Sequence, residues 1–238
     1  MPSESLIPDR RAQRRADQSR VGGADGDFGL IETLAFSRDT GFALFAGHME
    51  RLARSAAELD FALDAESAKA ALDEAVSQAP GANLRVRLVL WRGGALDATT
   101  TPLKPLAPGA QWRVAFAERR FHSAMPNLRH KTTRRALYED ELAHAVATFN
   151  VDEVIFLNER FELCEGARTT LFLRRDGALL TPPLHCGLLP GVLRASLLAS
   201  GEAREAVLTR DDLASGQVLM GNSVRGLVPA QLIGGPRA

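Results

Sequence analysis

Alternation of apolar and polar positions predicts where the ordered part of the chain begins. Residues 28–36 have the spacing of a strand, a turn is expected at 39–41, and 42–45 should form the returning strand of a hairpin. The period then changes. Apolar residues recur every three to four positions over 48–61 and again over 66–78, which predicts two consecutive helices.

The same patterns continue towards the C-terminus. Apolar, β-branched and aromatic residues predict strands at 83–92 and 112–117, and we expect these to complete a first α/β half. Thr132 or Thr133 is expected to cap a helix that ends near Phe149. The remaining predictions are strands at 152–157 and 168–174, a turn at Asp176-Gly177 into a strand at 178–180, a helix at 189–199, and strands at 217–221 and 225–232.

These elements predict an α/β (α+β) chain with three parts. Residues 1–26 contain five arginines among small and polar residues, with almost nothing apolar to bury, so we expect a flexible Arg-rich tail. Residues 27–120 should form a small N-terminal α/β domain. Residues 121–238 should form a larger C-terminal α/β domain.

Composition narrows the class of function. The 29 basic and 29 acidic residues cancel, so the overall charge does not favour nucleic acid or an anionic membrane as a partner. No apolar run approaches the ~20 residues of a membrane span. Cys164 and Cys186 lack CxxC spacing, which fits a reducing cytoplasm and gives no zinc motif. We expect a soluble cytoplasmic protein that handles a small molecule and holds no metal.

Only three lysines are available for lysine-dependent chemistry. Lys69 falls on the solvated face of a predicted helix and Lys104 lies between two prolines, whereas Lys131 sits at a loop or strand end. Arg129 and Arg134 flank Lys131, and neighbouring cations lower a lysine pKa by disfavouring its charged form. Taken alone, this pattern also fits an ordinary surface lysine.

Three further features could serve a phosphorylated aromatic cofactor. Glu165 lies in a short turn before an apolar strand, where a carboxylate could face a pyridine nitrogen or simply face solvent. Pro190 and Gly191 predict the start of a helix, where free backbone amides favour the binding of a phosphate. The guanidinium of Arg51 could bind that phosphate or lie on a helix surface.

Six motifs follow one another along the chain: Phe28-Gly-Leu-Ile-Glu-Thr33, the segment from His48 through Arg51 to Ala56, Lys131, Glu165 to Phe172, Thr181-Pro-Pro183, and Gly187 to Arg194. In this order they resemble the class IV aminotransferases, and the resemblance covers residues 28–232. Through Ile31-Glu-Thr33, Leu157-Asn158-Glu159 and 221–226, the sequence most resembles the aminodeoxychorismate lyases of that family, especially the lyase portion of fused para-aminobenzoate synthases.

The resemblance implies a two-domain pyridoxal 5′-phosphate (PLP) enzyme of fold type IV, like D-amino acid aminotransferase. Such enzymes are usually homodimers, with the cofactor between the domains and mostly held by the C-terminal one. By this resemblance Lys131 matches the Schiff-base lysine, Glu165 the partner of the pyridine nitrogen and Arg51 the phosphate-binding arginine. The amides of Val192 and Leu193 match the phosphate-binding helix start.

The resemblance also assigns residues near the substrate. Asn222, a cofactor contact, and Ser223, a substrate contact, match a late loop, and Thr33 matches a threonine near the reacting atoms that could relay a proton. Arg225 is a candidate partner for a substrate carboxylate. Thr170 stands where many relatives have Asn.

The activity implied is that of 4-amino-4-deoxychorismate lyase, which releases 4-aminobenzoate and pyruvate for folate synthesis. Two alternatives remain open at this stage. A transaminase acting on branched-chain or D-amino acids would use the same cofactor residues. A non-catalytic protein could also retain the fold.

Overall fold

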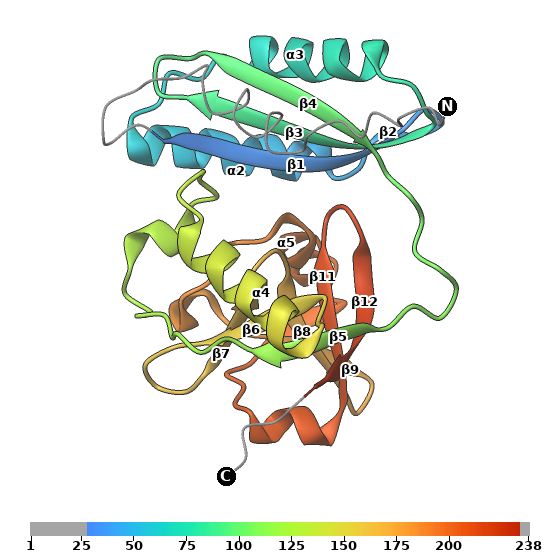
Figure 1. The fold of residues 1–238 in the computed structure, drawn as a ribbon. Helices are drawn as coiled ribbons and strands as arrows, with labels where there is room; N and C mark the ends of the chain where they lie inside the picture. The colour runs from blue at the N-terminus through green and yellow to red at the C-terminus, as the bar shows by residue number, and fades with distance from the viewer. Residues whose placement is uncertain (1–27, 234–238) are drawn as a thin grey trace, which may run out of the picture.

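The computed structural model describes residues 28–233, which form two β-sheets with helices packed on each (Figure 1). The predicted tail, 1–26, lies outside the described residues. The first sheet is antiparallel and has the order β2-β1-β3-β4. Its elements are β1 (Gly29–Ser37), β2 (Gly41–Phe42), α2 (Phe45–Leu59), α3 (Ala65–Gln78), β3 (Asn83–Trp91) and β4 (Leu96–Pro102).

Strand β1 gives the first sheet two chemically different faces. Leu30 and Leu34 belong to a buried apolar cluster with α2 and α3, and Glu32 points to the same side, where it bonds to side chains of α2. Because side chains alternate along a strand, Ile31 and Thr33 project from the opposite face. That opposite face lines a cavity.

The second sheet has eight strands in the order β10-β9-β8-β11-β12-β5-β6-β7. Strand β7 also pairs with β8, so the strands from β8 round to β7 form a closed ring. Helix α4 packs on β6, and α5 packs on β10 and β11. The elements are β5 (Trp112–Phe116), η1 (Pro126–Arg129), α4 (Ala136–Phe149), β6 (Glu153–Leu157), β7 (Leu163–Gly166), β8 (Thr170–Arg175), β9 (Ala178–Thr181), η2 (Leu184–Cys186), α5 (Val192–Ala199), β10 (Ala203–Glu205), η3 (Asp211–Ser215), β11 (Gln217–Asn222) and β12 (Gly226–Leu232).

Two predictions are wrong: that the strand at 112–117 completes the first α/β half, and that Thr132 or Thr133 caps the helix now seen as α4. Strand β5 does not complete the first half, because it pairs in parallel with β12 and β6 of the second sheet. Neither Thr132 nor Thr133 caps α4, whose N-cap position is occupied by Arg135. The two threonines are used elsewhere: Thr132 forms a bridge to Leu30, and the hydroxyl of Thr133 accepts a hydrogen bond from the amide of Gly29.

Other differences concern short elements. The hairpin is confirmed, but its returning strand has only two residues, because Leu44 adopts a left-handed conformation and α2 begins at Phe45. Glu165 lies inside β7 rather than in a turn. Strands β4, β7 and β10 and the three short 3₁₀ helices were not predicted. The other predicted helices and strands are confirmed, with ends that differ by up to three residues.

Candidate active site

A cavity of about 630 Å³ lies between the face of the first sheet that carries Thr33 and one end of the second sheet. Its wall combines residues far apart in the chain, including the start of α5 and the loop after β11. The structure brings together every site residue that the sequence predicts: the residues that line the cavity include Thr33, Arg51, Lys131, Glu165, Val192, Leu193, Asn222, Ser223 and Arg225.

Lys131 is attached to the first sheet through its backbone. Its carbonyl accepts a hydrogen bond of 2.7 Å from the amide of Ile31, and the amide of Thr133 donates to the carbonyl of Gly29 at 2.9 Å. The segment therefore runs alongside β1 as a short extra pairing. This pairing fixes the position of Lys131 along β1. Lys131 lies beside Ile31, and Thr33 is two residues further along the strand.

The surroundings of Lys131 favour its neutral amine. Burial is the main cause, followed by the positive charges of Arg135 and Arg51, and together they lower the lysine pKa to about 7. The carboxylates of Glu32 and Glu165 oppose that effect without cancelling it. A neutral amine can attack a carbonyl carbon or accept a proton, whereas an ammonium can do neither.

Glu165 presents a buried carboxylate to the same cavity. Its Oε1 accepts a hydrogen bond of 2.9 Å from the Tyr138 hydroxyl, and its Oε2 accepts one of 3.2 Å from the amide of Leu189. Burial raises the pKa of Glu165 to about 7, while these bonds and the charge of Arg135 oppose the rise. A cationic N–H group placed opposite Glu165 would favour the ionised form of this carboxylate and would pair with it.

The start of α5 forms a cradle with little space for side chains. No side chain caps this helix, and Gly191 occupies its N-cap position. A Cβ atom at Gly191 would lie 2.7 Å from Oγ1 of Thr170, so only glycine leaves this space open. Arg51 reaches the same place, where its Nη1 donates to the carbonyl of Pro190 at 3.3 Å. Amides, a hydroxyl and a guanidinium thus converge where an anion would fit.

The loop after β11 closes the cavity from another side. The side-chain oxygen of Asn222 accepts hydrogen bonds from the amides of Val224 and Arg225, at 3.0 and 2.9 Å, which gives the loop a defined turn. The hydroxyl of Ser223 donates to the carbonyl of Thr33 at 3.3 Å. This bond joins the loop to the first sheet.

Sequence reasoning missed a cationic wall on β3. Arg85 and Arg87 follow the alternation of that strand onto the cavity face. Burial, and then the charges of Arg85 and Arg135, lower the pKa of the half-buried Arg87. Within residues 28–233 no hydrogen bond or ion pair satisfies this guanidinium. Such a group is suited to bind a carboxylate of a ligand.

Sequence reasoning also missed Glu32, which lies just outside the cavity. Its carboxylate accepts two hydrogen bonds from the guanidinium of Arg51, and a third contact of 2.6 Å joins it to Nδ1 of His48. A usable signal was present. Glu32 interrupts the apolar face of a predicted strand, and His48 and Arg51 are three positions apart on one face of the following helix.

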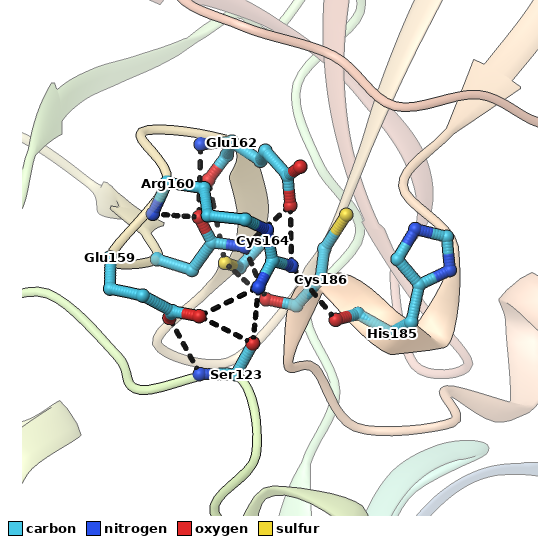
Figure 2. Close-up of polar contacts among 8 residues, drawn as sticks. Ser123, Glu159, Arg160, Glu162, Cys164, His185 and Cys186 are labelled. Atoms are coloured by element: carbon cyan, nitrogen blue, oxygen red, sulfur yellow. Dashed lines mark hydrogen bonds and ion pairs between the residues drawn. The ribbon is translucent and has the colours of Figure 1, made fainter.

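A second polar cluster holds the loops that lead to the site (Figure 2). Arg160 donates to the hydroxyl of Ser123, to the carboxylates of Glu159 and Glu162, and to the carbonyl of His185. These four partners belong to three separate segments. One leads to the lysine, one to the buried carboxylate and one to the cradle, so this cluster ties the backbone around the cavity together.

The two cysteines take no part in the cavity wall. Both are buried thiols, and Sγ of Cys164 donates to the carbonyl of Cys186 at 3.2 Å. Burial raises the pKa of Cys186 to about 12, which leaves it unreactive at neutral pH. Among residues 28–233, no three His, Cys, Asp or Glu side chains are grouped to hold a metal ion. No helix in that range has the length and apolar character needed to cross a bilayer.

Comparisons with known proteins agree with this geometry. The family model described as amino-transferase class IV matches residues 29–233. A Schizosaccharomyces pombe protein named "Putative aminodeoxychorismate lyase" is 28% identical over 210 residues, which cover 86% of this chain and 89% of that protein. A "Putative amino-acid aminotransferase" from Mesorhizobium loti is 45% identical, with a TM-score of 0.83 over 87% of this chain and 100% of that one.

A third similar protein is a hypothetical aminotransferase from Mycobacterium tuberculosis, solved in a form with α-ketoglutarate and PMP bound. It is 26% identical, with a TM-score of 0.76, and the match covers 91% of this chain and 85% of that one. The sheets, the cavity and these matches lead to one conclusion. The chain belongs to the class IV aminotransferase family of enzymes and has their fold type IV architecture.

Proposed function

We propose that this chain is a PLP-dependent lyase that acts on 4-amino-4-deoxychorismate. One observation carries the cofactor part of the proposal. Lys131 and Glu165 line one cavity, each with a pKa near 7, beside the cradle at the start of α5. PLP requires three groups: a lysine whose neutral amine is available near pH 7, a carboxylate suited to a ring N–H, and an anion cradle.

The residues present fit the cofactor. Lys131 would hold its aldehyde carbon, Glu165 its pyridine nitrogen, and Arg51 with the first amides of α5 its phosphate. The space that Gly191 leaves beside Thr170 supports the last assignment, because a phosphate needs close approach to backbone amides. When bound, PLP supplies an electron sink that stabilises negative charge at the amine-bearing carbon of a substrate.

The chain's own groups then have separable tasks. The neutral amine of Lys131 accepts the proton from the amine-bearing carbon, for which its lowered pKa suits it. Glu165 remains ionised opposite a cation, helped by the hydrogen bonds from Tyr138 and Leu189. Thr33 carries a hydroxyl on the cavity face and would relay a proton near the reacting atoms.

The cationic wall supports the lyase. Aminodeoxychorismate carries two carboxylates, and Arg87 with Arg85 offers charged donors on the β3 side of the cavity. Arg225 provides another from the late loop, although one of its Nη groups already donates to the carbonyl of Lys104. The relative from Schizosaccharomyces pombe, which covers nearly the whole chain, adds support for this substrate.

A transaminase is the second candidate. The observation that favours it is the higher identity, 45%, to the Mesorhizobium loti protein named for aminotransferase activity. The cationic wall would then bind the second carboxylate of glutamate or 2-oxoglutarate. The two activities differ in their products: the lyase would release 4-aminobenzoate and pyruvate, whereas a transaminase would pass the amino group of one substrate to a 2-oxo acid.

The remaining parts of the proposal concern organisation. We propose two domains, with the boundary moved from 120 to the segment 103–111 between β4 and β5, because β5 belongs to the second sheet. We propose a homodimer in the cytoplasm. Exposed Val146 and Phe149 on α4 offer apolar surface for a subunit contact, and two buried reduced cysteines suit that compartment.

Product analysis tests the activity. Purified protein saturated with PLP is incubated with aminodeoxychorismate and, separately, with branched-chain or D-amino acids plus 2-oxoglutarate. We expect 4-aminobenzoate and pyruvate in equal amounts from the first reaction. Glutamate in the second reaction with no 4-aminobenzoate in the first would establish the transaminase instead.

A further inference from the structure

We infer that Glu32 is a positioning residue, which holds the guanidinium of Arg51 in the orientation that a cofactor phosphate requires. This inference rests on the proposed function, because it needs a phosphate beside Arg51. Glu32 touches neither cofactor nor substrate: it lies on the helix-facing side of β1, is 1% exposed, and is not part of the cavity wall. Its effect is transmitted through Arg51.

The contact between the two residues is a two-point fork. Nε of Arg51 donates to Oε1 of Glu32 at 2.9 Å, and Nη2 donates to Oε2 at 2.6 Å. Both bonds lie in the plane of the guanidinium, so they fix its rotation as well as its position. A single bond would leave the plane free to turn.

Two N–H donors of Arg51 remain available for a ligand. A guanidinium has five N–H groups. Glu32 occupies the one on Nε and one on Nη2, and the carbonyl of Pro190 occupies one on Nη1. The two that are left sit on Nη1 and Nη2, at the end of the side chain. Since Arg51 lines the cavity and Glu32 does not, this end is the one that can meet a phosphate.

His48 fixes Glu32 in turn. Burial disfavours an ionised Glu32, but the charge of Arg51 and hydrogen bonds from His48 and Arg51 outweigh it, so the pKa of Glu32 lies below its ordinary value. An ionised carboxylate only accepts, and therefore Nδ1 of His48 must donate to it. The other ring nitrogen, Nε2, has no partner within the described residues and is buried. Within the described residues, the imidazole of His48 therefore forms its hydrogen bond to Glu32 alone.

Two effects of Glu32 on a phosphate oppose each other. Its negative charge repels the anion, and its fork pre-orients the donors that bind the anion. We expect the fork to dominate, because the carboxylate occupies the Nε–Nη2 edge and leaves the Nη1–Nη2 end free, and the positive charge of Arg51 offsets the repulsion. Loss of Glu32 should therefore weaken phosphate binding, although it removes a negative charge.

The test compares ligands with and without a phosphate in a double-mutant cycle. Dissociation constants for PLP and for pyridoxal are measured on wild type, Glu32→Gln, Arg51→Ala and the double variant, each relative to wild type. We expect Glu32→Gln to weaken PLP binding about 10- to 100-fold, in line with a charged hydrogen bond, and pyridoxal binding less than about threefold. Once Arg51 is Ala, adding Glu32→Gln should change PLP binding less than about threefold.

Controls separate positioning from a general structural effect. Glu50→Gln makes the same change at an exposed position of α2 and should leave both ligands unaffected. If Glu32→Gln does not fold, Glu32→Asp is measured instead. It keeps the charge but is too short to reach both donors, and we expect a smaller loss confined to PLP.

Two results would overturn the inference while leaving the proposed function intact: an equal loss for PLP and pyridoxal, or a full additional loss in the Arg51→Ala background. A different result would reject both. If wild-type protein binds PLP no better than pyridoxal, no phosphate is bound at Arg51, and the cofactor assignment fails with the inference.

Discussion

The hydroxyl of Tyr138 donates a hydrogen bond of 2.9 Å to the carboxylate of Glu165, from a helix of the chain onto a strand 27 residues later. The two groups influence each other in opposite ways. The bond favours the charged form of Glu165, whereas burial and the nearby carboxylate raise the pKa of Tyr138 well above its ordinary value. Tyr138 therefore remains a donor across the physiological range.

Removing this donor should shift the pH dependence of turnover. In Tyr138→Phe the pKa of Glu165, already raised to about 7 by burial, should rise further, because a bond to the charged form is lost. Activity needs the ionised carboxylate, so the acid limb of the kcat profile should move to higher pH. An unmoved acid limb would show that Glu165 does not control it.

Replacing the carboxylate itself is more severe. Glu165→Gln keeps the shape but removes the charge that would hold a pyridine nitrogen protonated. We expect kcat to fall about 100-fold or more, since each ~1.4 kcal/mol of lost transition-state stabilisation is tenfold in rate. Turnover within a few-fold of wild type, with an unchanged absorbance spectrum of bound PLP, would make Glu165 an ordinary structural residue.

The lowered pKa of Lys131 predicts how fast apoprotein takes up PLP. Only the neutral amine reacts, so the rate should rise through about pH 7 rather than through the ordinary lysine pKa of 10.5. Arg135→Met removes a neighbouring positive charge and should move the midpoint upwards. Arg204→Met, outside the cavity, serves as control. Stopped-flow absorbance gives the rates, and borohydride reduction followed by peptide mapping should locate the label on Lys131 rather than on Lys69 or Lys104.

The cradle at Gly191 can be closed with a single methyl group. The backbone at Gly191 has φ of −63°, so alanine is conformationally acceptable, yet its Cβ would lie 2.7 Å from Oγ1 of Thr170. Gly191→Ala should weaken PLP binding about tenfold or more while the apoprotein stays folded. Adding Thr170→Ala should restore part of the affinity. Gly93→Ala, with nothing within 4 Å, is the matched control, and an equal loss there would contradict the cradle.

Close approach of two loops predicts a stability defect. Gly187 has φ of +90°, and a Cβ there would lie 2.7 Å from Cα of Ser123. Gly187→Ala should lower the free energy of unfolding by about 2 kcal/mol, combining left-handed strain with a backbone clash. Gly201→Ala has the strain alone, with φ of +77° and open space, and should cost about 1 kcal/mol. Urea denaturation of both variants isolates the clash.

Strong periodicity made the larger elements predictable, and its absence explains those that were missed. Strand β4 lies at the edge of its sheet and carries Asp97 and Thr99 to Thr101; only Leu96 and Ala98 pack against the core, so the apolar alternation is too short to mark a strand. The returning strand of the first hairpin was drawn too long because Phe45 is apolar. Leu44 adopts a left-handed conformation that its residue type does not predict, and this turn ends the strand pairing.

The residues that line the cavity were predictable where chemistry restricts the residue type. Lys131 and Glu165 belong to motifs, and both line the cavity. Residues that act through packing were less visible. Glu32 resembles any glutamate until the buried partners on α2 are in place, and Thr133 resembles a helix cap until β1 offers the amide of Gly29. Such partners are brought together by tertiary structure alone.

The pairing of Lys131 with β1 has a mechanical consequence. The amine of Lys131 is carried by a segment that is hydrogen-bonded to the first-sheet wall of the cavity, through Ile31 and Gly29. A hinge motion that separated the two sheets would either break these hydrogen bonds or move Lys131 away from Glu165. We therefore do not expect a ligand to enter by separation of the sheets. A ligand should instead enter past the loop of Asn222 to Arg225, which is joined to the first sheet by the 3.3 Å hydrogen bond of Ser223 and to the segment after β4 by the bond from Arg225 to the carbonyl of Lys104.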